Sequence, residues 1–167
     1  HFTEDPPDHY WPVYKGASFR HWEPDTGERH SYADPEVITE YLQEKRENSY
    51  RYAGARSAFS EMPEEWVKNK ETLSCYYPRV AFRGVARATD SRTLIPALVP
   101  PEVALTSRVT HFIWPRGDEV DEAYLLGVLS TIPLDWYSRR FVEANVNYFI
   151  VNALPVPRVD DDNPLYQ

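Results

Sequence analysis

The spacing of apolar positions changes several times along the chain, which predicts helices and short strands in mixed order. A helix is expected to begin at Asp34 and Pro35, because Asp is a favoured N-cap and Pro suits the first helical position. Glutamates occupy one side of this helix, and the apolar stripe on the other side consists of Val37, Ile38, Tyr41 and Leu42. We therefore expect the helix to cover a sheet.

Short apolar runs bounded by turn-forming residues predict strands. They cover residues 11–19, 30–32, 79–87, 94–99, 109–114 and 147–154. In the third run, Val80 and Phe82 share one face, while Arg79 and Arg83 share the other. Gly84 marks a bulge or a close approach between two backbone segments.

Further helices are expected in the second half of the chain. Acidic residues at 118–122 suit the first turn of a helix, where carboxylates meet the positive end of the helix dipole. Pro133 is expected to end that helix, and another is expected from Leu134 to about Glu143. A short helix near 63–70 lies in an otherwise loop-like stretch. The order of elements predicts a single α+β domain with a mixed or largely antiparallel sheet and packed helices.

Length and composition suit one folded domain, because 167 residues with 14% aromatic side chains can form a core. The chain opens on His1 and a Pro- and acid-rich stretch. We interpret residues 1–10 as a linker from a missing upstream domain, 11–158 as the folded domain and 159–167 as an acidic tail. A single cysteine excludes an internal disulfide, and the sequence has neither a signal-peptide pattern nor a long apolar run. We expect a cytoplasmic protein without a membrane segment.

The net charge of −8 disfavours a nucleic-acid partner, because phosphate contacts require cations. The charge is unevenly distributed, however. Residues 1–71 contain 9 basic and 15 acidic groups, residues 79–116 contain 6 and 2, and residues 117–167 contain 3 and 9. All basic residues of the middle segment are arginines, which suit bidentate contacts with phosphates and guanine edges. The same arginines could instead be ordinary strand surface or ion pairs with the acidic flanks.

The sequence contains no pattern that predicts a catalytic, cofactor or metal site. The six glycines are too dispersed for a nucleotide-binding loop, and the five histidines lack metal-ligand spacing. No lysine follows a carboxylate at the spacing of common nucleases, and no serine lies in a nucleophile-elbow motif. Helix capping explains the acidic residues at 118–122 and Asp135 better than acid–base chemistry does. A binding module is therefore the simplest class.

The stretch 79–101, with the sequence RVAFRGVARATDSRTLIPALVPP, resembles the C-terminal specificity region of single-chain adenine-specific restriction–modification proteins. Segments 123–130, 134–147 and 154–157 resemble later parts of that region in the same order, and 15–22 is similar to its opening strand. The resemblance spans most of residues 11–158. It points to type IIG enzymes and related phage-defence methyltransferases, with looser similarity to type I specificity subunits, and implies a target-recognition-domain-like fold.

In that family, an N-terminal domain binds S-adenosylmethionine and methylates the N6 atom of adenine through an Asn/Asp-Pro-Pro-Tyr/Phe motif, which this sequence lacks. The resemblance implies that the chain is a sequence-specific module for recognition of double-stranded DNA, without catalytic residue, cofactor or metal of its own. S-adenosylmethionine would belong to the parent protein. The implied partners are DNA and the upstream methyltransferase domain, whether or not the parent also cleaves DNA.

The resemblance and the basic segment together select candidate DNA contacts. The first set consists of Arg79, Arg83, Arg87 and Arg92, with Thr89, Asp90, Ser91 and Thr93 as short polar groups able to reach phosphates or bases. Lys15 and Ser18 form a second set. Each residue could instead cap a turn or form a surface ion pair. We expect Arg83 and Arg92 to read bases and Arg79 to hold the DNA backbone.

A protein-docking domain is the alternative function. It would use the acidic flanks for electrostatic steering and a set of exposed aromatic side chains. That set consists of Tyr10, Trp11, Tyr14 and Trp22.

Overall fold

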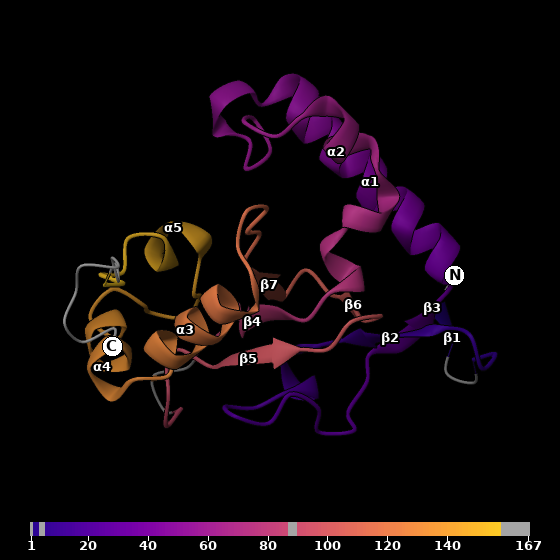
Figure 1. Cartoon of the computed structure of the whole chain (residues 1–167). Helices are drawn as coiled ribbons and strands as arrows, with labels where there is room; N and C mark the ends of the chain where they lie inside the picture. Colours follow the sequence, from indigo (N-terminus) through magenta and orange to yellow (C-terminus); the bar gives the residue numbers. More distant parts are fainter. Residues whose placement is uncertain (1, 4–5, 87–89, 158–167) are drawn as a thin grey trace.

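The computed structural model describes residues 2–3, 6–86 and 90–157, and within them the chain is an α+β fold built on two small sheets (Figure 1). The first sheet has the strand order β1-β3-β2-β6, and the second has the order β5-β4-β7. The strands are β1 (Phe2–Thr3), β2 (Trp11–Tyr14), β3 (Ser31–Ala33), β4 (Arg79–Arg83), β5 (Pro96–Val99), β6 (Ala104–Leu105) and β7 (Val109–His111). Among the described strands, only β2 and β6 pair in parallel, so the strand pairing is largely antiparallel, as predicted.

The helices are α1 (Pro35–Tyr52), α2 (Glu64–Lys68), α3 (Glu119–Leu129), α4 (Ile132–Ser138) and α5 (Tyr148–Val151). In the described part of the chain, short 3-10 helices accompany them: η1 (Gly16–Ser18), η2 (Gly54–Arg56), η3 (Lys70–Thr72) and η4 (Ser74–Tyr76). In Figure 1, α1 and α2 form an arm above the sheets, while α3, α4 and α5 gather at the end of the second sheet. No helix among the described residues has both the length and the apolar character needed to cross a bilayer.

Strand β4 is buried on both faces, because two separate apolar clusters meet on it. Val80 and Phe82 face a cluster that contains residues of α3, α4 and α5, whereas Ala81 faces a cluster that contains Tyr14 and Phe19. The predicted alternation along this strand is therefore confirmed. The close approach at Gly84 is confirmed too, since its N–H donates to the carbonyl of Arg108 at 2.9 Å.

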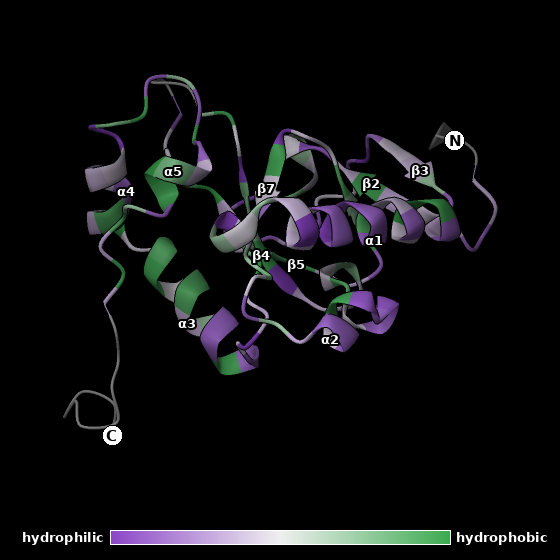
Figure 2. Ribbon diagram, turned by 90° about the horizontal axis from the view of Figure 1, so that it is seen from above, coloured by the Kyte–Doolittle hydropathy of each residue, from purple (hydrophilic) through white to green (hydrophobic). Residues whose placement is uncertain are grey.

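Helix α1 begins as predicted, with the Asp34 carboxylate accepting from the N–H of Glu36 at 2.9 Å. The predicted apolar stripe is only half right, because Ile38 and Leu42 pack inward while Val37 and Tyr41 are exposed. The fully buried positions of α1 are instead polar: Thr39, Gln43 and Arg46. The pairing of Gln43 and Arg46 with carbonyls near α2 explains the shift, and Figure 2 shows α1 as mostly hydrophilic.

The C-terminal elements differ most from the expectation. Pro133 does not end a helix but lies in the first turn of α4, which stops at Ser138 rather than near Glu143. The strand predicted over 147–154 is wrong, because these residues form α5 and a turn. Val151 and Leu154 are the buried positions there, and a spacing of three matches one helical turn.

Several other boundaries also move. The strand predicted over 11–19 ends at Tyr14 and continues as η1, and the run 94–99 is a strand only over Pro96–Val99. Residues 2–3, which we assigned to a linker, pair with β3 at the edge of the first sheet. Arg87, Thr89 and the predicted acidic tail lie outside the described residues.

Candidate nucleic-acid interface

Three segments that are distant in sequence meet on the side of the molecule away from the α1–α2 arm, at the lower edge of Figure 1. They are the turn at 20–23, the end of β4 together with the connection to β5, and the C-terminal end of α4. We call the cationic side chains that they bring together the arginine cluster: Arg20, Arg83, Arg92 and Arg139. Only Arg83 and Arg92 were singled out from the sequence.

Arg83 joins the end of β4 to the turn at 20–23. Its Nη2 donates to the carbonyl of Phe19 at 2.6 Å, and its guanidinium carbon lies 6.0 Å from the centre of the Phe19 ring. Burial lowers the pKa of Arg83, the charge of Arg20 adds to this effect, and the carboxylate of Asp90 opposes it. Arg20 and Asp90 are therefore electrostatic neighbours of Arg83.

Arg92 connects the same turn to helix α3. Its Nη2 donates to the carbonyl of Ser130, the C-cap of α3, and lies 3.2 Å from Nε2 of His21. A guanidinium has no acceptor atom, so Nε2 of His21 accepts and the imidazole is neutral, with its proton on Nδ1. Burial, followed by the charge of Arg92, lowers the pKa of His21 below its usual 6.5.

Asp135 holds α4 against the start of β5. Its buried Oδ1 accepts from the N–H groups of Thr93 and Leu94 at 2.7 and 2.8 Å. Its other oxygen lies 3.5 Å from Nε of Arg139. Nη2 of Arg139 then donates to the carbonyls of Asp90 and Ser91 at 2.9 and 2.6 Å, so one Asp–Arg pair positions residues 90–94 of the connection between β4 and β5.

The candidates of the β4–β5 connection thus occupy different environments. Ser91 is exposed and Asp90 partly exposed, with their carbonyls bound to Arg139. Thr93 is buried, and its N–H bonds to Asp135. Asp90 and Ser91 therefore lie at the arginine cluster, whereas Thr93 supports it from inside.

Arg79 is placed inside the fold, contrary to our interpretation of it as a contact for the DNA backbone. The residue is 4% exposed, and its Nη2 donates to the carbonyl of Val103 at 2.6 Å. Its Nη1 lies 3.3 Å from the carbonyl of Ser74. Burial lowers the pKa of Arg79 to about 10. A side chain so enclosed joins segments of the protein and cannot reach an external phosphate in this conformation.

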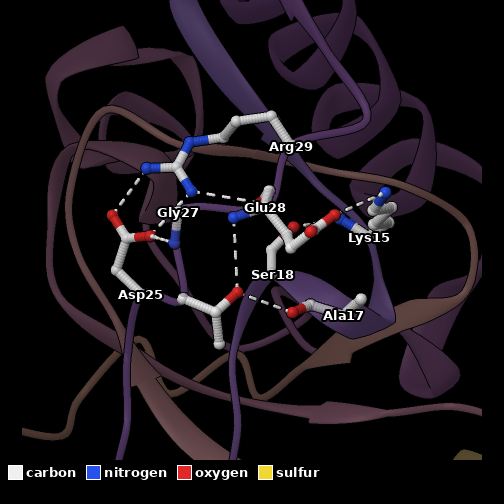
Figure 3. A network of polar contacts seen from close by, with 8 residues as sticks. Lys15, Ala17, Ser18, Asp25, Gly27, Glu28 and Arg29 are labelled. Atoms are coloured by element: carbon white, nitrogen blue, oxygen red, sulfur yellow. Dashed lines mark hydrogen bonds and ion pairs between the residues drawn. The ribbon is translucent and has the colours of Figure 1, made fainter.

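Lys15 and Ser18 belong to a network that folds residues 15–29 (Figure 3). Ser18 is fully buried, and its Oγ accepts from the N–H of Lys15 at 2.9 Å. The Lys15 ammonium lies 3.2 Å from a carboxylate oxygen of Glu28. Nearby, Asp25 and Arg29 form a bidentate pair at 2.7 and 2.6 Å, which lowers the pKa of Asp25 to about 2. Both candidates of the second set therefore have structural partners.

Sequence reasoning missed Arg20, His21 and Arg139 as members of the site. The available signal was the short basic-aromatic run at 20–22 and the adjacent arginines at the end of α4. Neither feature indicates by itself that the two segments meet.

The alternative docking surface does not form as we expected. Trp11 and Tyr14 are buried in apolar clusters, and Tyr10 is partly buried. Of the four aromatic residues, only Trp22 is well exposed.

A cleft of about 840 Å³ lies elsewhere, between the α1–α2 arm and the second sheet. Its lining includes the aromatic side chains of Trp66, Tyr77 and Trp114 and the polar groups of His111 and Glu122. Burial and the charge of Arg79 lower the pKa of His111 to about 4, whereas burial raises the pKa of Glu122. Glu122 also accepts from the N–H of Val80 at 2.9 Å, so it joins α3 to β4.

Within the described parts of the chain, no three His, Cys, Asp or Glu side chains are grouped as metal ligands would be. The chain matches no protein-family model, no curated protein and no solved structure.

Proposed function

We propose that this chain is the DNA target-recognition module of a larger bacterial N6-adenine methyltransferase of the restriction–modification or phage-defence type. The arginine cluster is the observation on which the proposal rests. A chain with a net charge of −8 gathers four arginines from three separate segments at one place. Such a concentration of guanidinium groups suits duplex DNA. Its phosphates are anionic, and both the phosphates and the guanine edges offer two acceptor atoms to one guanidinium.

The exposure of each arginine decides whether we assign it to phosphates or to bases. Arg20 and Arg139 are exposed and suit sequence-independent phosphate contacts, which set the position of the domain on the duplex. Arg20 has a long ion pair with Glu23, at 3.8 Å on the surface, and Arg139 binds its protein partners through Nε and Nη2, with no described bond from Nη1. Arg83 and Arg92 lie deeper, and their described hydrogen bonds use only Nη2. We assign base reading to these two, because each guanidinium carries five N–H donors and is fixed in direction by its protein partners.

Catalysis would belong to the upstream domain. In this proposal that domain binds S-adenosylmethionine and takes the target adenine out of the stack, while the present chain selects the sequence that is offered to it. The implied partners are double-stranded DNA and the methyltransferase domain, and the compartment is the bacterial cytoplasm, where the DNA is.

The salt dependence of DNA binding tests the proposal directly. Binding of this chain to a random-sequence duplex should be measured by fluorescence anisotropy over a range of salt concentrations. The double variant Arg20→Ala with Arg139→Ala removes two proposed phosphate contacts, so the slope of log affinity against log salt should fall by about 2. The matched control, Arg51→Ala with Lys68→Ala, removes the same charge from the exposed surface of α1 and α2.

The control should leave the slope unchanged. If both double variants alter it equally, net charge and not the arginine cluster governs binding, and the assignment of the interface is wrong. If the unmodified chain and both variants show no affinity for DNA at low salt, the proposed function itself is rejected.

A further inference from the structure

Trp22 occupies a backbone conformation that a bulky side chain normally avoids. Arg20 and Glu23 exchange both backbone hydrogen bonds, at 2.8 and 2.9 Å, and so enclose a two-residue turn of His21 and Trp22. Trp22 has φ = 63°, in the left-handed region that the second turn residue reaches easily only as Gly or Asn. Such strain persists only where the surrounding structure holds the residue in place, and strained residues are concentrated at functional sites.

Packing of the indole does not offset this strain, because the ring lies outside the core. Trp22 is 64% exposed, whereas Phe19 at the base of the same turn is completely buried. The ring contact described for Trp22 is an edge-on approach to His21, with 5.4 Å between ring centres. The hydrophobic effect would favour burying a tryptophan, yet this fold holds it outward.

The turn is held firmly from below by the arginine cluster. Arg83 donates to the carbonyl of Phe19 just before the turn, and Arg92 donates to the ring of His21 within it. On the other side, the N–H of Thr26 donates to the carbonyl of Ser18 at 2.9 Å. A flat apolar ring therefore projects from a fixed turn, directly beside the cations that we assign to DNA.

We propose that Trp22 is a stacking wedge, which inserts its indole against a base at an opened or kinked step while the arginine cluster holds the surrounding backbone. This inference rests on the proposed function. An indole can stack on any base, so the contact tolerates sequence differences. The neighbouring guanidinium groups bring phosphates to the turn, and its fixed geometry avoids the ordering cost that a mobile side chain would have.

A comparison of paired and unpaired duplexes tests the wedge. The probes are two labelled duplexes of the same sequence, one fully paired and one with a central mismatch that is already partly unstacked. The unmodified chain should bind the mismatched duplex more tightly, because less unstacking remains to be done. Trp22→Ala should reduce affinity for the mismatched duplex by roughly 5-fold or more, by the usual worth of one stacked base, and remove the preference. Trp22→Phe should retain most of both.

The matched control is Tyr52→Ala, which removes an aromatic ring that is 74% exposed at the far end of α1. It should bind both duplexes like the unmodified chain. Trp22→Gly provides a measurement independent of DNA, since it should raise the melting temperature relative to Trp22→Ala by relieving the positive φ. This result would establish that the strain exists even while the preference for the mismatched duplex is lost.

The outcomes separate the wedge from the proposed function. If the variant Arg20→Ala with Arg139→Ala weakens DNA binding but Trp22→Ala binds both duplexes normally, the wedge is wrong and the recognition function stands. If Trp22→Ala weakens both duplexes equally, the ring makes only a surface contact, which also overturns the wedge. If no variant changes binding, the proposed function fails and the wedge fails with it.

Discussion

Nη2 of Arg92 lies 3.2 Å from Nε2 of His21, a contact that joins two residues 71 positions apart and closes the arginine cluster. The contact requires a neutral imidazole, because only an unprotonated Nε2 can accept from the guanidinium. It also leaves Nδ1 of His21 buried without a hydrogen-bond partner among the described residues. The turn that presents Trp22 is thus tied to the β4–β5 connection by an interaction that acid would break.

The free energy of unfolding should fall as the pH drops from 6.5 toward 4. His111 has a folded-state pKa of about 4 against a usual value of 6.5, and the pKa of His21 is lowered as well. Between these values the unfolded chain binds more protons, so acid favours unfolding, by an amount on the order of 3 kcal/mol for His111. Urea denaturation at several pH values measures this slope.

The variant His111→Gln should flatten the slope of unfolding free energy against pH, because it removes the histidine whose pKa is lowered to about 4. His9→Gln, at an exposed position near the start of the chain, is the matched control and should leave the slope as it is. Glu122 contributes with the opposite sign, since burial raises its pKa, but it is present in all three proteins and cancels in the comparison. Equal slopes for the unmodified chain and His111→Gln would contradict the prediction.

Arg79→Ala should destabilise the fold without changing the salt dependence of DNA binding. The substitution leaves the buried carbonyl of Val103 without its 2.6 Å donor and creates a cavity, so we expect a loss of about 2–4 kcal/mol in the free energy of unfolding. Chemical denaturation gives the stability, and anisotropy at several salt concentrations gives the slope. If the variant instead had unchanged stability and a smaller slope of log DNA affinity against log salt, Arg79 would be a DNA contact.

The sequence predicts local features of this fold better than long-range ones. The Asp34 cap, the Asp118 cap and the alternation along β4 depend on neighbouring residues, and all three are observed. The strand prediction for residues 147–154 was wrong because a short apolar run is compatible with either a strand or a helical turn. Only the packing of Val151 and Leu154 decides between these two structures.

The site was predictable only in part, for the same reason. The excess of arginine in 79–116 is visible in the sequence, but burial divides these residues: Arg79 joins the interior and Arg92 joins the cluster. Arg20 and Arg139 belong to the site only because the chain folds back on itself, and no local spacing encodes that meeting.

Gly84→Ala should lower stability, whereas Gly127→Ala should raise it. A Cβ at Gly84 would lie 3.0 Å from the backbone carbonyl oxygen of Arg108, closer than a Cβ normally approaches, so the two backbone segments must separate by a few tenths of an ångström, at a cost of roughly 1–3 kcal/mol. A Cβ at Gly127 meets nothing within 4 Å in the last turn of α3, and Ala improves helix propensity by about 0.5–1 kcal/mol. Thermal unfolding of both variants checks the pair, and a stable Gly84→Ala protein would mean that the close approach relaxes freely.

Arg83 and Arg92 should read the DNA sequence, whereas Arg139 should contact only phosphates. In the parent enzyme, Arg92→Lys keeps the positive charge but removes the planar fork that can bind two acceptors of guanine together, so the methylated motif should become degenerate at one position, with about 1–3 kcal/mol of discrimination lost. Arg139→Lys is the matched control, because it also keeps its charge and lies at the same cluster, but at an exposed position that suits phosphates. It should lower the rate at all sites and leave the motif intact.

Methylation-sensitive sequencing of DNA modified by each variant distinguishes the two results. An unchanged motif from both Arg92→Lys and Arg83→Lys would assign base reading to another segment of the chain, while a relaxed motif from Arg139→Lys would make that residue a base reader and not a phosphate contact.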